Sequence, residues 1–238
     1  MQDPISSIYS DGNYERNNPG WHAGDSPWKA THIARLLDAH GVQPRRLCEV
    51  GCGAGEILVN LARRYGCPTT FTGYEVSPQA YAICCAKASA RLQFVNGSPF
   101  VSPLPEQEPF DVAMAIDVFE HVEDYIGFLR QFHPLGRYKV FHIPLDLSVQ
   151  TVFRASPLRR VRETVGHLHY FTKETALASL AHTGYTVIDH RYTAHAVELP
   201  NLGWKATLGI LPRRLSFALS EDLAVRILGG YSLLVLAT

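Results

Sequence analysis

Hydrophobic residues recur along the chain with two different periods. Short apolar runs of strand length are separated by stretches whose apolar residues recur every three or four positions, as on one face of a helix. Because strand and helix patterns alternate in the first half of the chain, a parallel sheet with helices on both faces is predicted. The apolar runs predict seven strands, at residues 47–50, 70–76, 92–95, 112–116, 139–143, 186–192 and 233–236.

Turn and capping residues delimit the predicted helices. Ser26, which Pro27 follows, predicts the N-terminus of a helix that ends at Gly41. Ser77 begins another helix after the second strand, and Thr172 caps the helix before the sixth strand. Amphipathic patterns predict two more helices, over residues 57–65 and 125–132.

The length and composition suit one domain. The 238 residues are 46% hydrophobic, which is enough for a substantial core. We therefore expect a single domain over residues 1–238. Residues 1–41 are expected to form its N-terminal lid and first helix, and residues 146–172 and 194–228 to be insertions on the substrate side.

Charge balance and cysteine content narrow the classes of function. Lysine plus arginine equals aspartate plus glutamate at 22 each, so no overall field attracts a polyanion. A small-molecule substrate is therefore expected, and nucleic-acid binding is not. No apolar run has the length of a membrane span, and five cysteines, two of them adjacent, exclude a full disulfide framework. We expect the protein in the cytoplasm, and the sequence leaves its oligomeric state open.

The most informative segment, between the first strand and the next helix, reads Glu49-Val50-Gly51-Cys52-Gly53-Ala54-Gly55-Glu56. Glycines are needed where a ligand lies against the backbone and the turn is too tight for a Cβ. Glu75, at the end of the second strand, has nearly the spacing expected of a carboxylate that binds ribose hydroxyls. The two features together predict a nucleoside site.

The glycine spacing and Glu49 indicate which nucleoside binds. Gly51, Gly53 and Gly55 alternate, whereas a dinucleotide fingerprint places its third glycine three residues after the second. The Glu49 carboxylate would oppose a pyrophosphate at the helix N-terminus, but it suits the positively charged amino group of a methionine moiety. The charge therefore favours a nucleoside with a cationic methionine moiety over a dinucleotide.

The sequence resembles the class I S-adenosylmethionine-dependent methyltransferases, particularly the ubiquinone- and menaquinone-biosynthesis-like group. The resemblance lies in the glycine turn, in Glu75 and in the segment Asp117-Val118-Phe119-Glu120-His121. The likeness covers roughly residues 30 to 238. It implies a Rossmann-like, seven-stranded, mostly parallel sheet in which residues 233–236 form the last, antiparallel edge strand. Asn96 stands where an aspartate often contacts the adenine amine in that family. The expected cofactor-binding residues are Glu49, Gly51, Cys52, Gly53, Gly55, Glu75, Val76, Asn96, Asp117 and Val118.

Four histidines are candidates for a general base or a substrate contact, because imidazole titrates near neutral pH. His121 follows the fourth strand, and His142 lies at the end of the fifth. Substrate-facing groups collect at this edge of such sheets. His167 and His169 precede the sixth strand, and they share one face if that segment is extended. Each histidine also has a structural explanation, as part of a turn, a cap or a loop anchor.

Aromatic and basic residues away from the glycine turn are candidates for substrate recognition. Tyr14, Trp21 and Trp28 can stack on a substrate or surround the sulfonium, with anchoring of the lid as the alternative. Arg159 lies in a basic cluster that would bind an anionic substrate, unless the cluster is a solvated surface. Lys29 can reach a cofactor carboxylate, although a solvated helix face is the default for a lysine.

The leading hypothesis is an enzyme that methylates a small biosynthetic metabolite on oxygen, nitrogen or carbon. No metal is assigned, since no second cysteine pair accompanies Cys48 and Cys52 at metal-ligand spacing. One alternative is a metal-assisted RNA 3′-terminal 2′-O-methyltransferase, because Asp117, Glu120 and His121 with a later histidine are similar to the set in plant small-RNA methyltransferases. Another is a non-catalytic adenosyl-binding regulatory module, which the fold alone does not exclude.

Overall fold

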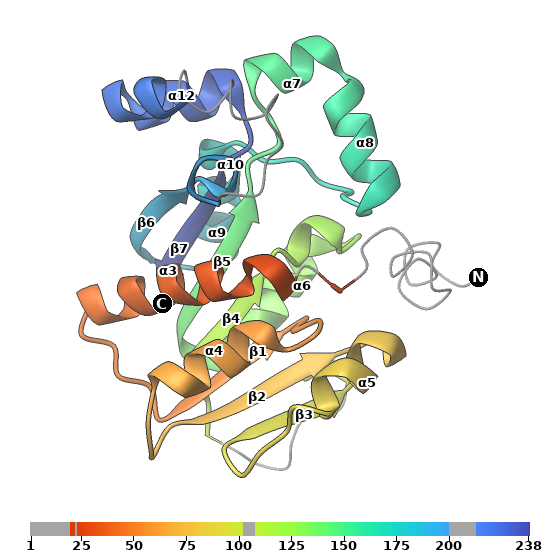
Figure 1. The fold of residues 1–238 in the computed structure, drawn as a ribbon, viewed down its shortest axis with the longest axis vertical. Helices are drawn as coiled ribbons and strands as arrows, with labels where there is room; N and C mark the ends of the chain where they lie inside the picture. Colours follow the sequence, from red (N-terminus) through yellow and green to blue (C-terminus); the bar gives the residue numbers. More distant parts are fainter. Residues whose placement is uncertain (1–19, 22, 102–107, 200–212) are drawn as a thin grey trace.

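The computed structural model describes residues 20, 21, 23–101, 108–199 and 213–238. Within these ranges the chain forms a seven-stranded sheet in the order β3-β2-β1-β4-β5-β7-β6 (Figure 1). All seven strands lie within three residues of the predicted bounds, so the strand predictions are confirmed. The strands are β1 (Arg46–Val50), β2 (Thr70–Glu75), β3 (Leu92–Asn96), β4 (Phe110–Ile116), β5 (Gly136–Pro144), β6 (Val187–Thr193) and β7 (Ser232–Ala237).

The strand directions confirm a mostly parallel sheet with an antiparallel edge. Neighbours among β1 to β5 pair in parallel, whereas β7 pairs antiparallel with both β5 and β6. The outermost position, however, belongs to β6, and the last strand is inserted between β5 and β6. This order agrees with composition: β7 is an apolar and almost fully buried strand, while β6 carries charged residues that suit a partly solvated edge.

Helices cover both faces of the sheet, as predicted. On one face α3 and α4 lie side by side and pack on Leu47, Met114 and Val140 (Figure 1). On the other face α6 and α9 pack on Ala115 and Phe141. The helices are α3 (Ser26–Ala39), α4 (Glu56–Arg64), α5 (Pro78–Cys85), α6 (Tyr125–Phe132), α7 (Val149–Arg154), α8 (Ser156–Thr164), α9 (Lys173–His182), α10 (His195–Glu198) and α12 (Glu221–Leu228), with short 3-10 turns at Ala23–Asp25, Phe119–His121 and His133–Leu135.

Two of the predicted caps explain where α5 and α9 begin. The Ser77 hydroxyl accepts from the backbone N–H of Ala80, and Thr172 forms a capping box with Thr175 at the start of α9. The prediction for α3 is wrong by one residue, because its N-cap is Asp25 and not Ser26. A 3-10 turn leads into this helix, and the Asp25 carboxylate binds a lysine side chain instead of the backbone.

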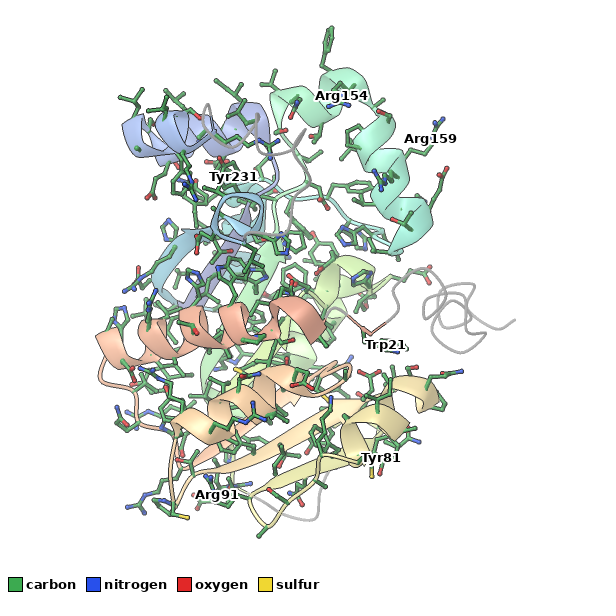
Figure 2. All side chains as sticks on the ribbon, in the orientation of Figure 1. Trp21, Tyr81, Arg91, Arg154, Arg159 and Tyr231 are labelled. Carbon is green, nitrogen blue, oxygen red and sulfur yellow. The ribbon has the colours of Figure 1, made fainter. Side chains whose placement is uncertain are left out.

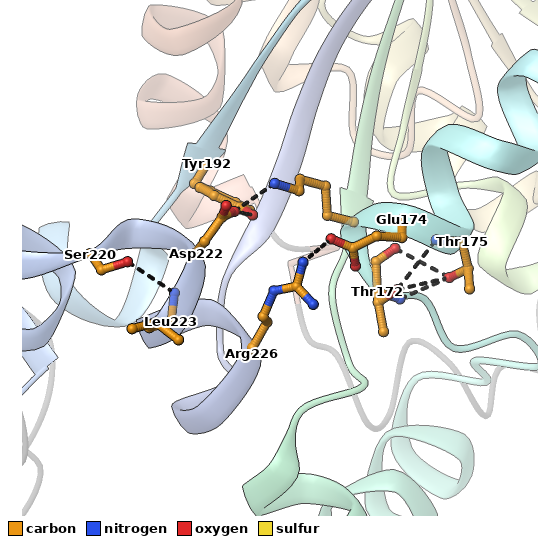
Figure 3. A network of polar contacts seen from close by, with 9 residues as sticks. Thr172, Glu174, Thr175, Tyr192, Ser220, Asp222, Leu223 and Arg226 are labelled. Atoms are coloured by element: carbon orange, nitrogen blue, oxygen red, sulfur yellow. Dashed lines mark hydrogen bonds and ion pairs between the residues drawn. The ribbon is translucent and has the colours of Figure 1, made fainter.

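The segments between β5 and β7 place helices beyond the carboxyl end of β5. There α7 packs against α12, and α8 follows on the side of α7 away from α12 (Figure 1). Polar contacts tie α12 to its surroundings: Lys173 Nζ donates to Asp222 Oδ1 at 2.6 Å, and Arg226 pairs with Glu174 (Figure 3). None of the described helices is long and apolar enough to span a bilayer.

Candidate active site

A cavity of about 520 Å³ opens at the carboxyl ends of β1 and β4, where the strand order reverses. In α/β sheets, ligands bind in the crevice at such a point. The walls come from the turns after β1 and β4, the start of α3 and the segment after α8. Eight of the ten predicted cofactor residues line the cavity, all but Gly55 and Asn96, as do Trp21, Trp28, His121, His142 and His167.

The glycine turn brings backbone directly against the cavity. Gly51 has a φ of 74° and donates its N–H to the Tyr74 carbonyl at 2.8 Å. A Cβ at this position would lie 2.8 Å from a methyl of Val118, so a side chain here would force Val118 to shift. Gly53 has a φ of 53° and donates to the Glu75 carboxylate at 2.7 Å. The turn therefore holds its shape only because glycine tolerates these conformations and contacts.

Glu75 is fixed by backbone donors on both of its oxygens. Oε2 accepts from Gly53, and Oε1 accepts from the backbone N–H of Ser77 at 2.8 Å. Burial raises the pKa of Glu75 above its ordinary value, although these backbone donors oppose the shift. Each carboxylate oxygen has a second lone pair, so the group can still accept hydrogen bonds from ligand hydroxyls in the cavity.

Glu49 supplies a second, less satisfied carboxylate. Its side chain is buried, and Oε2 accepts no hydrogen bond from any residue in the described part of the chain. Burial raises the pKa of Glu49 well above its ordinary value; Lys29 opposes this shift, and Glu75 adds to it. A buried carboxylate oxygen without a donor is costly, and in a cavity wall it suits a ligand that brings a cationic donor.

Lys29 is buried among acids, and the default of a solvated helix face is wrong for it. Its Nζ lies 2.8 Å from Asp117 Oδ2 and 3.0 Å from Asp25 Oδ2. Burial alone would lower the pKa of Lys29, but the two aspartates raise it above its ordinary value. Burial also disfavours ionised Asp117, yet His142 and Lys29 hold the pKa of that carboxyl below its ordinary value. The ion pair joins α3 to the turn after β4.

His142 has both ring nitrogens engaged. Nδ1 lies 2.6 Å from Asp117 Oδ1, and Nε2 lies 2.8 Å from the hydroxyl of Thr193 on β6. The Asp117 backbone, at a φ of 53°, also donates to the His142 carbonyl at 2.9 Å. With neither nitrogen left for a substrate proton, this arrangement favours a positioning role, in which His142 orients Asp117.

A second polar group lies where the 3-10 turn after β4 meets the segment after α8. One atom each from Glu120, His121 and His167 lies within 4.8 Å of the others. His167 Nδ1 is 2.7 Å from Asp146 Oδ2. Burial, with Asp117 and Asp146 nearby, raises the pKa of Glu120 well above its ordinary value. The predicted histidines His121 and His167 are thus brought together.

The two tryptophans lie at the α3 side of the cavity. Trp21 has a φ of 51° and precedes the helix, where Figure 2 labels it. Trp28 donates its indole N–H to Glu198 at 2.8 Å and packs edge-on against the rings of His142 and His195. Both line the cavity, and the contacts of Trp28 also anchor the start of α3.

Several predicted site residues lie elsewhere. Gly55 is the N-cap of α4; its φ of 77° and a Cβ contact of 2.7 Å with the Phe94 ring explain why glycine stands there. Asn96 ends β3, and His169 binds the carbonyls of Val122 and Glu123.

Arg159 points away from the molecule on α8, 76% exposed, beside Glu163 (Figure 2). Tyr14 lies outside the described residues.

Sequence reasoning missed the partners that hold these groups in place. Asp25, Asp146 and Thr193 each contact a candidate site residue, the last two from a distant part of the chain. Asp25 and Lys29 have the i, i+4 spacing of a helical ion pair, which is the one signal in the sequence. Nothing local to Asp146 or Thr193 distinguishes them, since their roles depend on sheet order and on the path of the segment after α8.

The fold and the cavity together define a Rossmann-like α/β protein with a nucleoside-type site at its switch point. More particularly, the chain belongs to the methyltransferase domain family, whose model matches residues 22–190. The predicted family is therefore confirmed at the level of the methyltransferase domain.

A curated relative is similar to part of this chain in sequence. Norajmaline N-methyltransferase of Rauvolfia serpentina is 28% identical over 110 residues, which cover 43% of this chain and 36% of that protein. The match therefore spans about a third of the length of that relative.

Solved structures share the fold at low sequence identity. The N-methyltransferase NodS of Bradyrhizobium japonicum, in complex with S-adenosyl-L-homocysteine, superposes with a TM-score of 0.59 at 18% identity and covers 94% of this chain and 95% of its own. A methyltransferase of Geobacter sulfurreducens in complex with the same molecule gives 0.60 at 16% identity, covering 99% and 98%. At these identities the structures establish the fold, which is the predicted one.

Proposed function

We propose that this protein transfers a methyl group from S-adenosylmethionine to a small molecule. One observation carries the proposal: a single cavity joins the glycine turn, with its unsatisfied Glu49 carboxylate, to a wall that contains His121 and His167. A cofactor and an acceptor can therefore meet in one cavity. Methyl transfer needs this proximity and alignment more than it needs a strong catalytic group.

The residues around the glycine turn fit the parts of this cofactor. Glu49 would bind the ammonium of the methionine moiety, and Glu75 would accept both ribose hydroxyls. The nearest atom to a Cβ built at Gly53 would be 4.0 Å away, which leaves room beside the turn for the methionine chain. When bound, S-adenosylmethionine supplies an electrophilic methyl group on a sulfonium. The task of the protein is to orient the two partners and exclude water.

The charge of the cavity favours a neutral or cationic acceptor. Lys29 is the one lysine or arginine among its described lining residues, and two aspartates already bind it. The predicted anionic-substrate role of Arg159 gains no support from a side chain that points to solvent. The N-methyltransferase relatives make amines the first acceptors to test. Six acidic side chains line the cavity: Asp25, Glu49, Glu56, Glu75, Asp117 and Glu123.

The predicted substrate-side segments are part of this proposal. Residues 146–172 contribute Val165 and His167 to the cavity, and residues 194–228 contribute His195. Their helices lie beyond the carboxyl end of β5 (Figure 1). Variation in these segments would alter the acceptor without disturbing the glycine turn, as is common where loops on a rigid sheet carry specificity.

Calorimetry and turnover test the proposal in two steps. Isothermal titration of the full chain with S-adenosylmethionine should show one site. Release of S-adenosylhomocysteine is then followed against matched panels of amines, phenols and carboxylic acids, with turnover expected among the first two panels. Binding without turnover on any panel would favour the non-catalytic adenosyl-binding module, and an absence of binding would end both hypotheses.

Glu49→Gln should weaken S-adenosylmethionine binding about tenfold at neutral pH, because the amide keeps the shape but loses the charge that faces the ammonium. The wild-type affinity should rise with pH above 4.5, the ordinary value of this group, because the pKa of Glu49 is raised and a cationic ligand prefers the ionised form. Titration calorimetry at several pH values measures both effects. If the affinity of Glu49→Gln depends on pH as steeply as that of the wild type, another group is responsible for the pH dependence.

A further inference from the structure

Backbone contacts hold the Glu120, His121 and His167 cluster together. The N–H groups of Leu168 and His169 both donate to the Glu120 carbonyl, at 2.8 and 3.1 Å. They join the segment after α8 to the 3-10 turn after β4. The rings of His121 and His167 consequently lie 4.8 Å apart between centroids. The juxtaposition is therefore built by main-chain hydrogen bonds and not by chance contact of long side chains.

Within the part of the chain that the structure describes, the Glu120 carboxylate has no hydrogen-bond donor. The residue is fully buried, and neither carboxylate oxygen accepts a hydrogen bond from any residue in the described ranges. Its contact with His121 Nε2 is long, at 3.8 Å. A buried carboxylate costs several kcal/mol unless a cation or several donors compensate it. A ligand that brings positive charge between Glu120 and the two imidazoles would supply this compensation.

His167 is oriented as a metal ligand would be. Its Nδ1 is 2.7 Å from Asp146 Oδ2, which fixes the ring and leaves Nε2 available to the cluster. Histidines that bind metals commonly donate their second ring N–H to a carboxylate in this way, which sets the tautomer and makes the other, unprotonated nitrogen a stronger metal ligand. Asp146 is thus a positioning residue in this arrangement.

We propose that Glu120, His121 and His167 bind one divalent transition-metal ion. Two imidazoles and one carboxylate suit Zn²⁺, Fe²⁺, Mn²⁺ or Co²⁺ better than Mg²⁺ or Ca²⁺, which prefer oxygen ligands alone. The three ligand atoms lie within 4.8 Å of one another, whereas ligands about 2.1 Å from a tetrahedral ion lie roughly 3.4 Å apart. Small side-chain rotations would close the set around an ion.

The position of the ion suggests a role in acceptor binding, and this part rests on the proposed function. His121 and His167 line the cavity, so an open coordination position would face it and take an oxygen or nitrogen atom of the acceptor. Asp117 is not one of the proposed metal ligands, although the similarity to plant small-RNA methyltransferases includes it among them. Its two oxygens are held by Lys29 and His142.

Cobalt binding tests the site without reference to turnover. The full chain is freed of metal with a chelator and titrated with Co²⁺, followed by visible absorption, and Zn²⁺ is then added as a competitor. Because the exposed thiols of Cys67 and Cys85 could bind these ions, both are changed to serine in every protein compared. One Co²⁺ per chain is expected, displaced by one Zn²⁺.

Three variants and one matched control locate the ion. Glu120→Gln and His167→Gln should each weaken Co²⁺ binding by more than about 100-fold, and Asp146→Asn by about 10- to 100-fold. His40→Gln is the control, since His40 also pairs with an aspartate, Asp189 at 2.9 Å, but lies outside the cluster. It should bind Co²⁺ like the parent protein.

The outcomes are distinguishable from those of the methyl-transfer proposal. If the parent binds no Co²⁺, or if all variants bind it equally, the metal site is wrong. Calorimetry with S-adenosylmethionine on the same proteins reports separately on the cofactor site and on folding. Retained cofactor binding with lost Co²⁺ binding in the Glu120 and His167 variants supports the site. Retained cofactor binding with no Co²⁺ binding in the parent removes the metal proposal alone.

Discussion

Glu75→Gln is expected to weaken S-adenosylmethionine binding at least about 100-fold, or roughly 3 kcal/mol. Both carboxylate oxygens accept from backbone N–H groups, of Gly53 at 2.7 Å and of Ser77 at 2.8 Å. A glutamine keeps one acceptor but turns its own N–H₂ toward the other donor. The glycine turn must then shift, and the acceptor for one ribose hydroxyl is lost as well. Titration calorimetry measures the change.

Glu56→Gln is the matched control for this experiment. Glu56 also lines the cavity beside the glycine turn, but its partly exposed carboxylate pairs with Lys87 at 2.7 Å. Removal of the same charge at this position should change the affinity less than about threefold, because an exposed ion pair contributes little. Equal losses of affinity in the two variants would mean that binding depends on the net charge of the cavity and not on the position of the Glu75 carboxylate.

Lys29→Met is expected to lower the free energy of unfolding by about 3–5 kcal/mol, the usual cost of removing one partner from a buried ion pair. The Lys29 side chain is 10% exposed and is bound by Asp25 and Asp117. Methionine fills similar volume but leaves two aspartates, and the nearby Glu49, without their cation. Urea-induced unfolding followed by circular dichroism measures the effect.

Arg159→Met provides the comparison for an exposed pair. Arg159 and Glu163 are 76% and 65% exposed, so the change should cost less than about 0.5 kcal/mol. Combining Lys29→Met with Asp117→Asn should cost less than the sum of the two single changes, because the second removes the charge that the first leaves unpaired. Additive losses, or a Lys29 effect as small as that of Arg159, would contradict the buried ion pair.

The sequence predicted those parts of the fold that depend on local chemistry. Strand positions follow from apolar runs, and Ser77 and Thr172 cap helices through hydrogen bonds to residues three positions away. The glycine turn is equally local, since Gly51 and Gly53 need conformations that other residues avoid. Most of the predicted cofactor residues therefore line the cavity, because they all follow strands that end at one edge of the sheet.

The parts that were not predicted depend on which distant elements meet. A lysine on an amphipathic helix is normally solvated, and only the turn after β4 makes Lys29 a buried group. His142 ends a strand as expected, but Thr193 on β6 occupies its second nitrogen. The burial of Glu120 likewise follows from the segment after α8 folding over it. No local pattern reports these contacts.

The insertion of β7 between β5 and β6 has a consequence for how the chain folds. During translation, β5 and β6 emerge before their shared neighbour, so β6 has no partner in the sheet and the apolar edge of β5 stays open until residues 232–237 have left the ribosome. Pairings between strands distant in sequence form slowly, and open strand edges invite pairing with other chains. This half of the sheet should therefore be the last to become protected from hydrogen exchange and the part most dependent on chaperones.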